Sequence, residues 1–122
     1  MKEKTVSINS ILLDTINPRF DPVSNQSEAV LSLLDKCGDK IVKLASDIIS
    51  MGTNPSDIVI CTEEKLPSGK TVYVAKEGNR RLLAIKAIIK PETAINANWR
   101  QKFARLAHSA GGIGKTPKKL RV

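Results

Sequence analysis

The spacing of apolar residues along the chain changes twice, and this limits the possible folds more than any other feature of the sequence. Residues 25–37 and 39–52 carry apolar residues at helical spacing. Residues 58–62 and 71–75 are instead rich in β-branched residues, and a Pro-Ser-Gly turn separates them, which predicts an antiparallel pair of strands. Helical spacing then returns. We therefore predict an α+β fold with a small mixed sheet and packed helices.

The remaining segments complete this predicted organisation. Residues 78–89 predict a helix closed by Pro91, and residues 98–108 predict one more amphipathic helix. The last residues combine glycine, proline and charge without any period, which is typical of a flexible tail. We predict a folded domain over residues 1–91, a C-terminal helix over residues 92–109 and a flexible basic tail over residues 110–122.

Length and cysteine content narrow the class of protein. A chain of 122 residues can bury a core without disulfides, so Cys37 and Cys61 are expected to be free, small core residues. The longest apolar runs fall short of the roughly 20 residues that a membrane helix needs. No secretory signal is readable at the N-terminus. We therefore expect a cytoplasmic protein with no membrane partner.

The net charge of +8 is concentrated at one end of the chain. Residues 1–77 hold nine Lys or Arg and eleven Asp or Glu, whereas residues 78–122 hold eleven Lys or Arg and a single acid, Glu92. Such asymmetry is typical of a part that faces nucleic acid or phosphate, and a solvated surface explains it equally well. The tail supplies four candidate nucleic-acid contacts: Lys115, Lys118, Lys119 and Arg121.

The segment Glu77-Gly78-Asn79-Arg80-Arg81 stands where a predicted strand ends and a predicted helix begins. Two arginines in the first turn of a helix lie at the positive end of its dipole, where acidic side chains are preferred. A salt bridge to Glu77 would compensate one arginine. A bound phosphate would compensate both, through backbone N–H groups, a close approach at glycine and the guanidinium forks.

Helical geometry orients the side chains of this segment. At about 100° per residue, Arg81 shares the apolar face with Ile85 and Ile88. Asn79 shares another face with Lys86 and Lys90, and we expect that face to be in solvent.

The strand, the Gly78-Asn79-Arg80-Arg81 box and the Ala-containing helix after it resemble the Gly-Glu-Arg-Arg box of the ParB N-terminal domain. The resemblance extends upstream through the Asn17-Pro18-Arg19 loop, a helix before Gly52 and a strand at residues 58–60. It covers roughly residues 5–91. The chain is thus similar to the ParB/sulfiredoxin superfamily, an α+β fold whose members bind nucleoside triphosphates at this box.

The resemblance implies that Gly78, Arg80 and Arg81 line a phosphate site, with Arg19 on a neighbouring loop. Chromosome-partitioning members of the superfamily use CTP and some relatives are described as DNA nucleases, so the implied ligand is CTP or ATP. Asn79 stands where partitioning proteins have glutamate, so the role of that acid does not carry over. The chain also lacks room for their helix-turn-helix domain.

Other candidate sites are weaker. Asp14 and Asp21, with Glu77, could support a Mg²⁺ ion and its phosphates, although turn formation also explains the two aspartates. The run from Gly111 to Thr116 looks like the end of a Walker A loop, but Ser109 replaces its first glycine and no strand precedes it.

We therefore predict a nucleotide-binding domain, with slow Mg²⁺-dependent hydrolysis and a DNA-related role as further expectations. No general base can be named. A non-catalytic DNA-binding or adaptor module and a DNA nuclease are the alternatives. DNA and a second copy of the chain remain open as partners.

Overall fold

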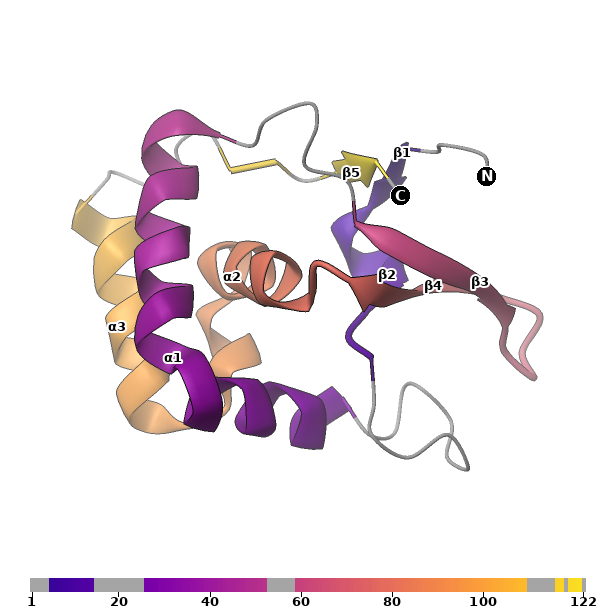
Figure 1. Ribbon diagram of the computed structural model, residues 1–122, viewed down its shortest axis with the longest axis horizontal. Coiled ribbons are helices and arrows are strands. Elements are labelled where there is room, and N and C mark those ends of the chain that lie inside the picture. Colours follow the sequence, from indigo (N-terminus) through magenta and orange to yellow (C-terminus); the bar gives the residue numbers. More distant parts are fainter. Residues whose placement is uncertain (1–4, 15–25, 53–58, 110–115, 118, 122) are drawn as a thin grey trace.

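The computed structural model describes residues 5–14, 26–52, 59–109, 116–117 and 119–121. It confirms the α+β fold: a small mixed sheet lies beside helices α1, α2 and α3 (Figure 1). None of the helices in these described ranges is both long and apolar enough to cross a membrane.

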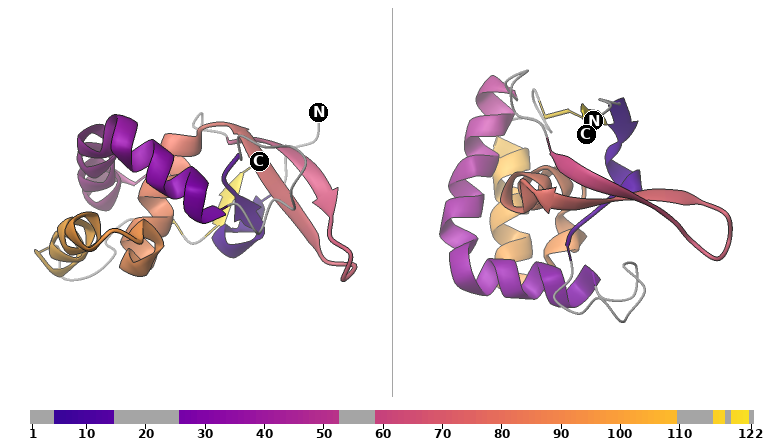
Figure 2. Two further views of the ribbon diagram at one scale, coloured as in Figure 1. Left: turned by 90° about the horizontal axis from the view of Figure 1, so that it is seen from below. Right: turned by 45° about the vertical axis from the view of Figure 1, so that its right-hand side comes forward.

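The main sheet has the strand order β2-β4-β3. Strand β3 (Ile60–Lys65) pairs antiparallel with β4 (Thr71–Glu77), which confirms the predicted hairpin with shifted bounds. Strand β2 (Ile11–Leu12) pairs parallel with β4 on its other edge. Figure 2 shows the β3–β4 hairpin projecting away from the helices, while β4 contacts helix α2.

A second, two-stranded sheet joins the two ends of the chain. Strand β1 (Thr5–Ser7) pairs antiparallel with β5 (Lys119–Arg121), with Val6 opposite Leu120. The prediction of a flexible tail is therefore wrong for Lys119–Arg121. Three residues are too few to show an alternating pattern, and the pairing depends on the distant strand β1.

The two helices predicted for this region are present as the two arms of one element, α1 (Gln26–Met51). The predicted break survives as a kink, because Cys37 has the non-helical angles φ −149° and ψ 30°. Gly38 follows the kink and packs against the Trp99 ring of α3 (Ala97–Ser109) so closely that an added Cβ would overlap the ring. The bend of α1 is visible in Figure 1, and α3 lies alongside the longer arm.

Helix α2 (Asn79–Ile89) is the central element of the fold. It contacts α1, α3, β4 and the 3-10 turn η2 (Pro91–Ala94), and Leu82, Leu83 and Ile85 on it are fully buried. Burial of a Leu or Ile side chain contributes about 1.5–3 kcal/mol each. Packing around α2 therefore holds the helical layer against the end of β4.

Lys86 on α2 does not face solvent, contrary to the expectation for its helix face. Its Nζ donates a hydrogen bond to the Ile8 carbonyl oxygen at 3.2 Å, in the 3-10 turn η1 (Ile8–Ser10). Burial lowers the pKa of Lys86 to about 8. A helical wheel cannot show that η1 packs on this face. Lys90 remains exposed, as expected.

We expect Gly38→Ala to lower the free energy of unfolding by about 1–3 kcal/mol, because the new methyl group overlaps the Trp99 ring. Urea denaturation measures the change. In a Trp99→Ala background the same substitution should cost nothing or stabilise by up to about 1 kcal/mol through helix propensity. An equal cost in both backgrounds would contradict the proposed contact.

The buried Lys86 also predicts a pH dependence of stability. Its pKa is lowered from 10.5 to about 8 in the folded chain, so the unfolded chain binds more protons between these values. The contribution of Lys86 to stability must therefore rise as the pH rises from 8 to 10.5. Cys61 acts in the opposite direction, because burial raises its pKa from 9.0 to about 11.

Cys61 is present in both wild type and Lys86→Met, so the difference in stability between the two proteins isolates the contribution of Lys86. We expect the difference in unfolding free energy, wild type minus variant, to grow by about 1–3 kcal/mol between pH 7.5 and pH 10.5. A difference that does not change with pH would show that the folded protein leaves the Lys86 pKa at its ordinary value.

Candidate functional site

The candidate site begins at the left-handed turn between β4 and α2. Gly78 has φ +90° and ψ 21°, a conformation that side chains with a Cβ rarely adopt. As the residue before the first turn of α2, it brings no side chain to cap the helix N–H groups, and that first turn contains no acidic residue. The positive end of the α2 dipole is therefore not neutralised by its own sequence.

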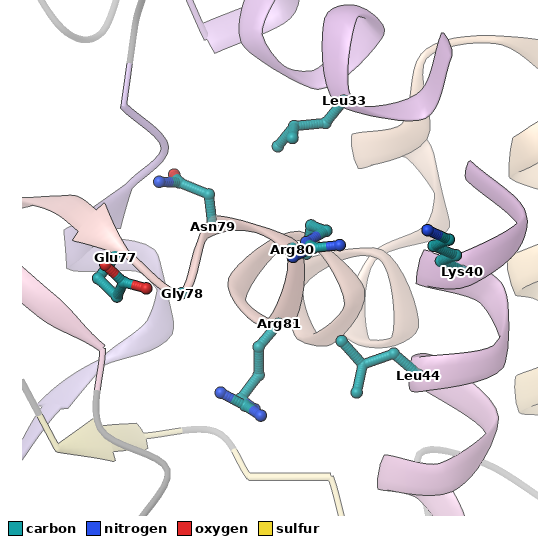
Figure 3. A pocket seen from close by; sticks show the side chains of 8 residues that line it. All are labelled: Leu33, Lys40, Leu44, Glu77, Gly78, Asn79, Arg80 and Arg81. Carbon is teal, nitrogen blue, oxygen red and sulfur yellow. The ribbon is translucent and has the colours of Figure 1, made fainter. Parts of the chain in front are cut away.

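A pocket of about 500 Å³ lies at this turn (Figure 3). Eight residues line it: Leu33, Lys40 and Leu44 from α1, and Glu77, Gly78, Asn79, Arg80 and Arg81 from the turn. The volume is within the range of small-molecule sites, about 300–1,000 Å³. The structure thus brings the four residues of the predicted box and Glu77 together at one pocket.

The pocket has an excess of positive charge. Lys40, Arg80 and Arg81 contribute cations, and Glu77 is the one acidic residue among the described lining residues. Arg80 is exposed, while Arg81 is half-buried, as its place on the apolar face predicts, and has an interaction partner within the chain. Figure 3 shows Arg80 and Lys40 on facing elements, with Arg81 extending to the opposite side of the turn from Asn79.

Lys40 was missed by the sequence reasoning. Lys40 and Leu44 are four residues apart, which places them on one face of the second arm of α1, whereas Leu33 lies on the first arm, before the kink at Cys37. That spacing was available, but nothing local indicated that this face meets the start of α2. Tertiary packing decides it.

Asn79 is half-buried, and its side chain connects three parts of the chain, whereas its helix face predicts a solvent-facing side chain. Its Oδ1 accepts a hydrogen bond from the backbone N–H of Asp14 at 2.9 Å, and its Nδ2 donates to the Ala75 carbonyl oxygen at 3.0 Å. One amide therefore joins the start of α2 to β4 and to the residue that follows Leu13 after β2. Glutamate could accept the first bond but could not donate the second.

Of the acidic candidates, the structure describes Asp14 and Glu77. The Asp14 carboxylate pairs with Lys76 at 3.2 Å, and Asp14 is not among the lining residues of the pocket that holds Glu77. Across the described ranges, no three His, Cys, Asp or Glu side chains are arranged to hold a metal ion.

Several predicted residues cannot be placed at the site. Arg19, Asp21, Lys115 and Lys118 lie outside the described residues, as does most of the Walker-like run. Lys119 is exposed on β5, and Arg121 belongs to the same strand. The nucleic-acid contacts of the tail cations therefore remain a prediction. The structure shows only that Lys119 and Arg121 belong to strand β5.

Comparison with known proteins gives no match to a family model, to a curated protein or to a solved structure. The resemblance to the ParB/sulfiredoxin superfamily therefore rests on the box, its neighbouring motifs and their order along the chain.

Because both ends of the Asn79 amide are used, we expect Asn79→Glu to lower the free energy of unfolding by about 1–3 kcal/mol. A solvent-facing side chain at position 79, as its helix face predicts, would make the same substitution nearly free of cost. Asn98→Glu is the matched control, since Asn98 is exposed in the first turn of α3. Equal stability of Asn79→Glu and wild type in urea would contradict the joining role of Asn79.

Proposed function

We propose that the pocket at the start of α2 binds the phosphate groups of a nucleoside triphosphate, CTP or ATP, and that the chain is a nucleotide-binding domain of the ParB/sulfiredoxin type. One observation carries the proposal. Three cations from two separate elements, Lys40 on α1 and both arginines of the turn, surround a helix start that has no acidic residue of its own.

The chemistry of each group suits a polyphosphate. The N–H groups and dipole of a helix start attract anions, and glycine lets phosphate oxygens approach the backbone. Guanidinium groups bind phosphate oxygens in pairs, while lysine acts as a mobile point charge. A triphosphate carries more charged oxygens than a single phosphate, so it can contact cations from both elements at once.

Hydrolysis is expected to be slow. A Mg²⁺ ion would enter with the triphosphate, and the amide of Asn79 can neither carry charge toward it nor accept a proton from water. That amide is also committed to Asp14 and Ala75. The proposed activity is therefore binding, with phosphate release as a secondary readout.

Nucleic-acid binding is the second candidate function, and α3 is the observation that favours it. Arg100, Lys102 and Arg105 are exposed on this helix, which has no acidic residue. A module that bound a phosphate backbone would show DNA affinity that falls steeply with salt and no saturable binding of free nucleotide. A nuclease would in addition cut DNA in the presence of Mg²⁺.

We expect CTP or ATP to bind saturably, and ligand at 100 times its Kd to stabilise the fold by about 2.7 kcal/mol in a thermal-shift experiment. Arg80→Ala and Lys40→Ala should each weaken binding about tenfold, because each removes a charged partner of phosphate. Arg105→Ala is the control, because it removes the same charge from α3, outside the lining of the pocket. It should leave nucleotide affinity within about twofold, because salt screens interactions between distant exposed charges.

Full nucleotide affinity in both Arg80→Ala and Lys40→Ala would show that these two cations do not bind the nucleotide and act only in folding or as surface charge. The same salt-dependent DNA affinity in Arg80→Ala and wild type, without nucleotide binding in either, would favour the second candidate.

A further inference from the structure

A second, smaller pocket adjoins the phosphate pocket. This second pocket has a volume of about 180 Å³ and is lined by Asp14, Ala29, Ser32, Leu33, Lys36 and Asn79. Leu33 and Asn79 line both pockets, so they form the boundary between them. The second pocket therefore lies next to a ligand held at the start of α2, beside the first arm of α1.

The two pockets differ in charge. The first has three cations and one carboxylate, which suits a polyanion. The second has one cation, Lys36, and one carboxylate, Asp14, and Asp14 also pairs with Lys76 at 3.2 Å. A phosphate group would gain little in the second pocket, whereas an uncharged part of the same ligand would meet no repulsion there.

The lining of the second pocket combines apolar carbon with hydroxyl partners. Ala29 is buried and Leu33 half-buried, and both present apolar side chains that suit the face of a sugar or base. Ser32 offers a hydroxyl, and the Asp14 carboxylate is an acceptor with two oxygens, one of which takes the Lys76 contact. A carboxylate beside a phosphate site is a common acceptor for the hydroxyl of a ribose.

We infer that the second pocket holds the sugar of the bound nucleotide, with the Asp14 carboxylate accepting a hydrogen bond from a ribose hydroxyl and Leu33 packing against the sugar. This inference rests on the proposed binding of the triphosphate in the first pocket. It makes the ligand a ribonucleotide and makes Asp14 a specificity-determining residue.

Binding of three ligands tests the inference: inorganic tripolyphosphate, a ribonucleoside triphosphate and its 2′,3′-dideoxy counterpart, each measured by calorimetry on the full chain. The wild type should bind the ribonucleotide about tenfold more tightly than the dideoxynucleotide, because a hydrogen bond to a charged group is lost. Tripolyphosphate should bind more weakly than the ribonucleotide.

Asp14→Ala should remove the preference for the ribonucleotide and leave tripolyphosphate affinity unchanged or slightly higher, since an anion has gone. Asp47→Ala is the control, because Asp47 is exposed on α1 outside the lining of both pockets. It should keep the tenfold preference.

The outcomes separate the two proposals. Equal affinity of the wild type for the ribonucleotide and the dideoxynucleotide overturns the sugar subsite, and this comparison needs no variant. An equal loss of tripolyphosphate and ribonucleotide binding in Asp14→Ala overturns it as well. Failure of the wild type to bind either tripolyphosphate or nucleotide overturns the phosphate pocket itself.

Discussion

The two hydrogen bonds of the Asn79 side chain are the constraint on which the site depends. Strand β2 pairs with β4 through only two residues, Ile11 and Leu12, so its end needs a further support. Asn79 provides that support because it accepts from the Asp14 N–H and donates to the Ala75 carbonyl oxygen. The first residue of α2 is thereby fixed to both strands at the point where the pocket opens.

The kink of α1 supplies the other wall of the pocket. Leu33 precedes the bend at Cys37 and Lys40 follows it, yet both line the same pocket. Trp99 packs on Gly38 immediately after the bend, and Lys102 one turn later on α3 contacts both the Trp99 ring and Asp39. Helix α3 therefore helps to position Lys40, although none of these α3 residues lines the phosphate pocket.

The turn breaks a local rule of helix stability. Two arginines at a helix start are unfavourable by about 0.3–1 kcal/mol each in comparison with acidic residues. Natural sequences keep such conflicts most often at functional sites. The conflict alone does not identify the ligand. The proposal of a nucleotide, in place of a single phosphate ion, rests on the facing cation Lys40 and the adjoining second pocket.

Local patterns in the sequence determined the helices, the β3–β4 hairpin, the break at Cys37-Gly38 and the turn at Gly78, because periodicity and glycine act within a few residues. They could not show the pairing of β1 with β5, the contact of Lys86 with Ile8 or the two partners of Asn79, which join residues far apart in the chain. Local patterns also could not show that Lys40 lines the phosphate pocket or that a second pocket lies beside it. A binding site assembled from two elements depends on how those elements pack, and only the tertiary structure decides that.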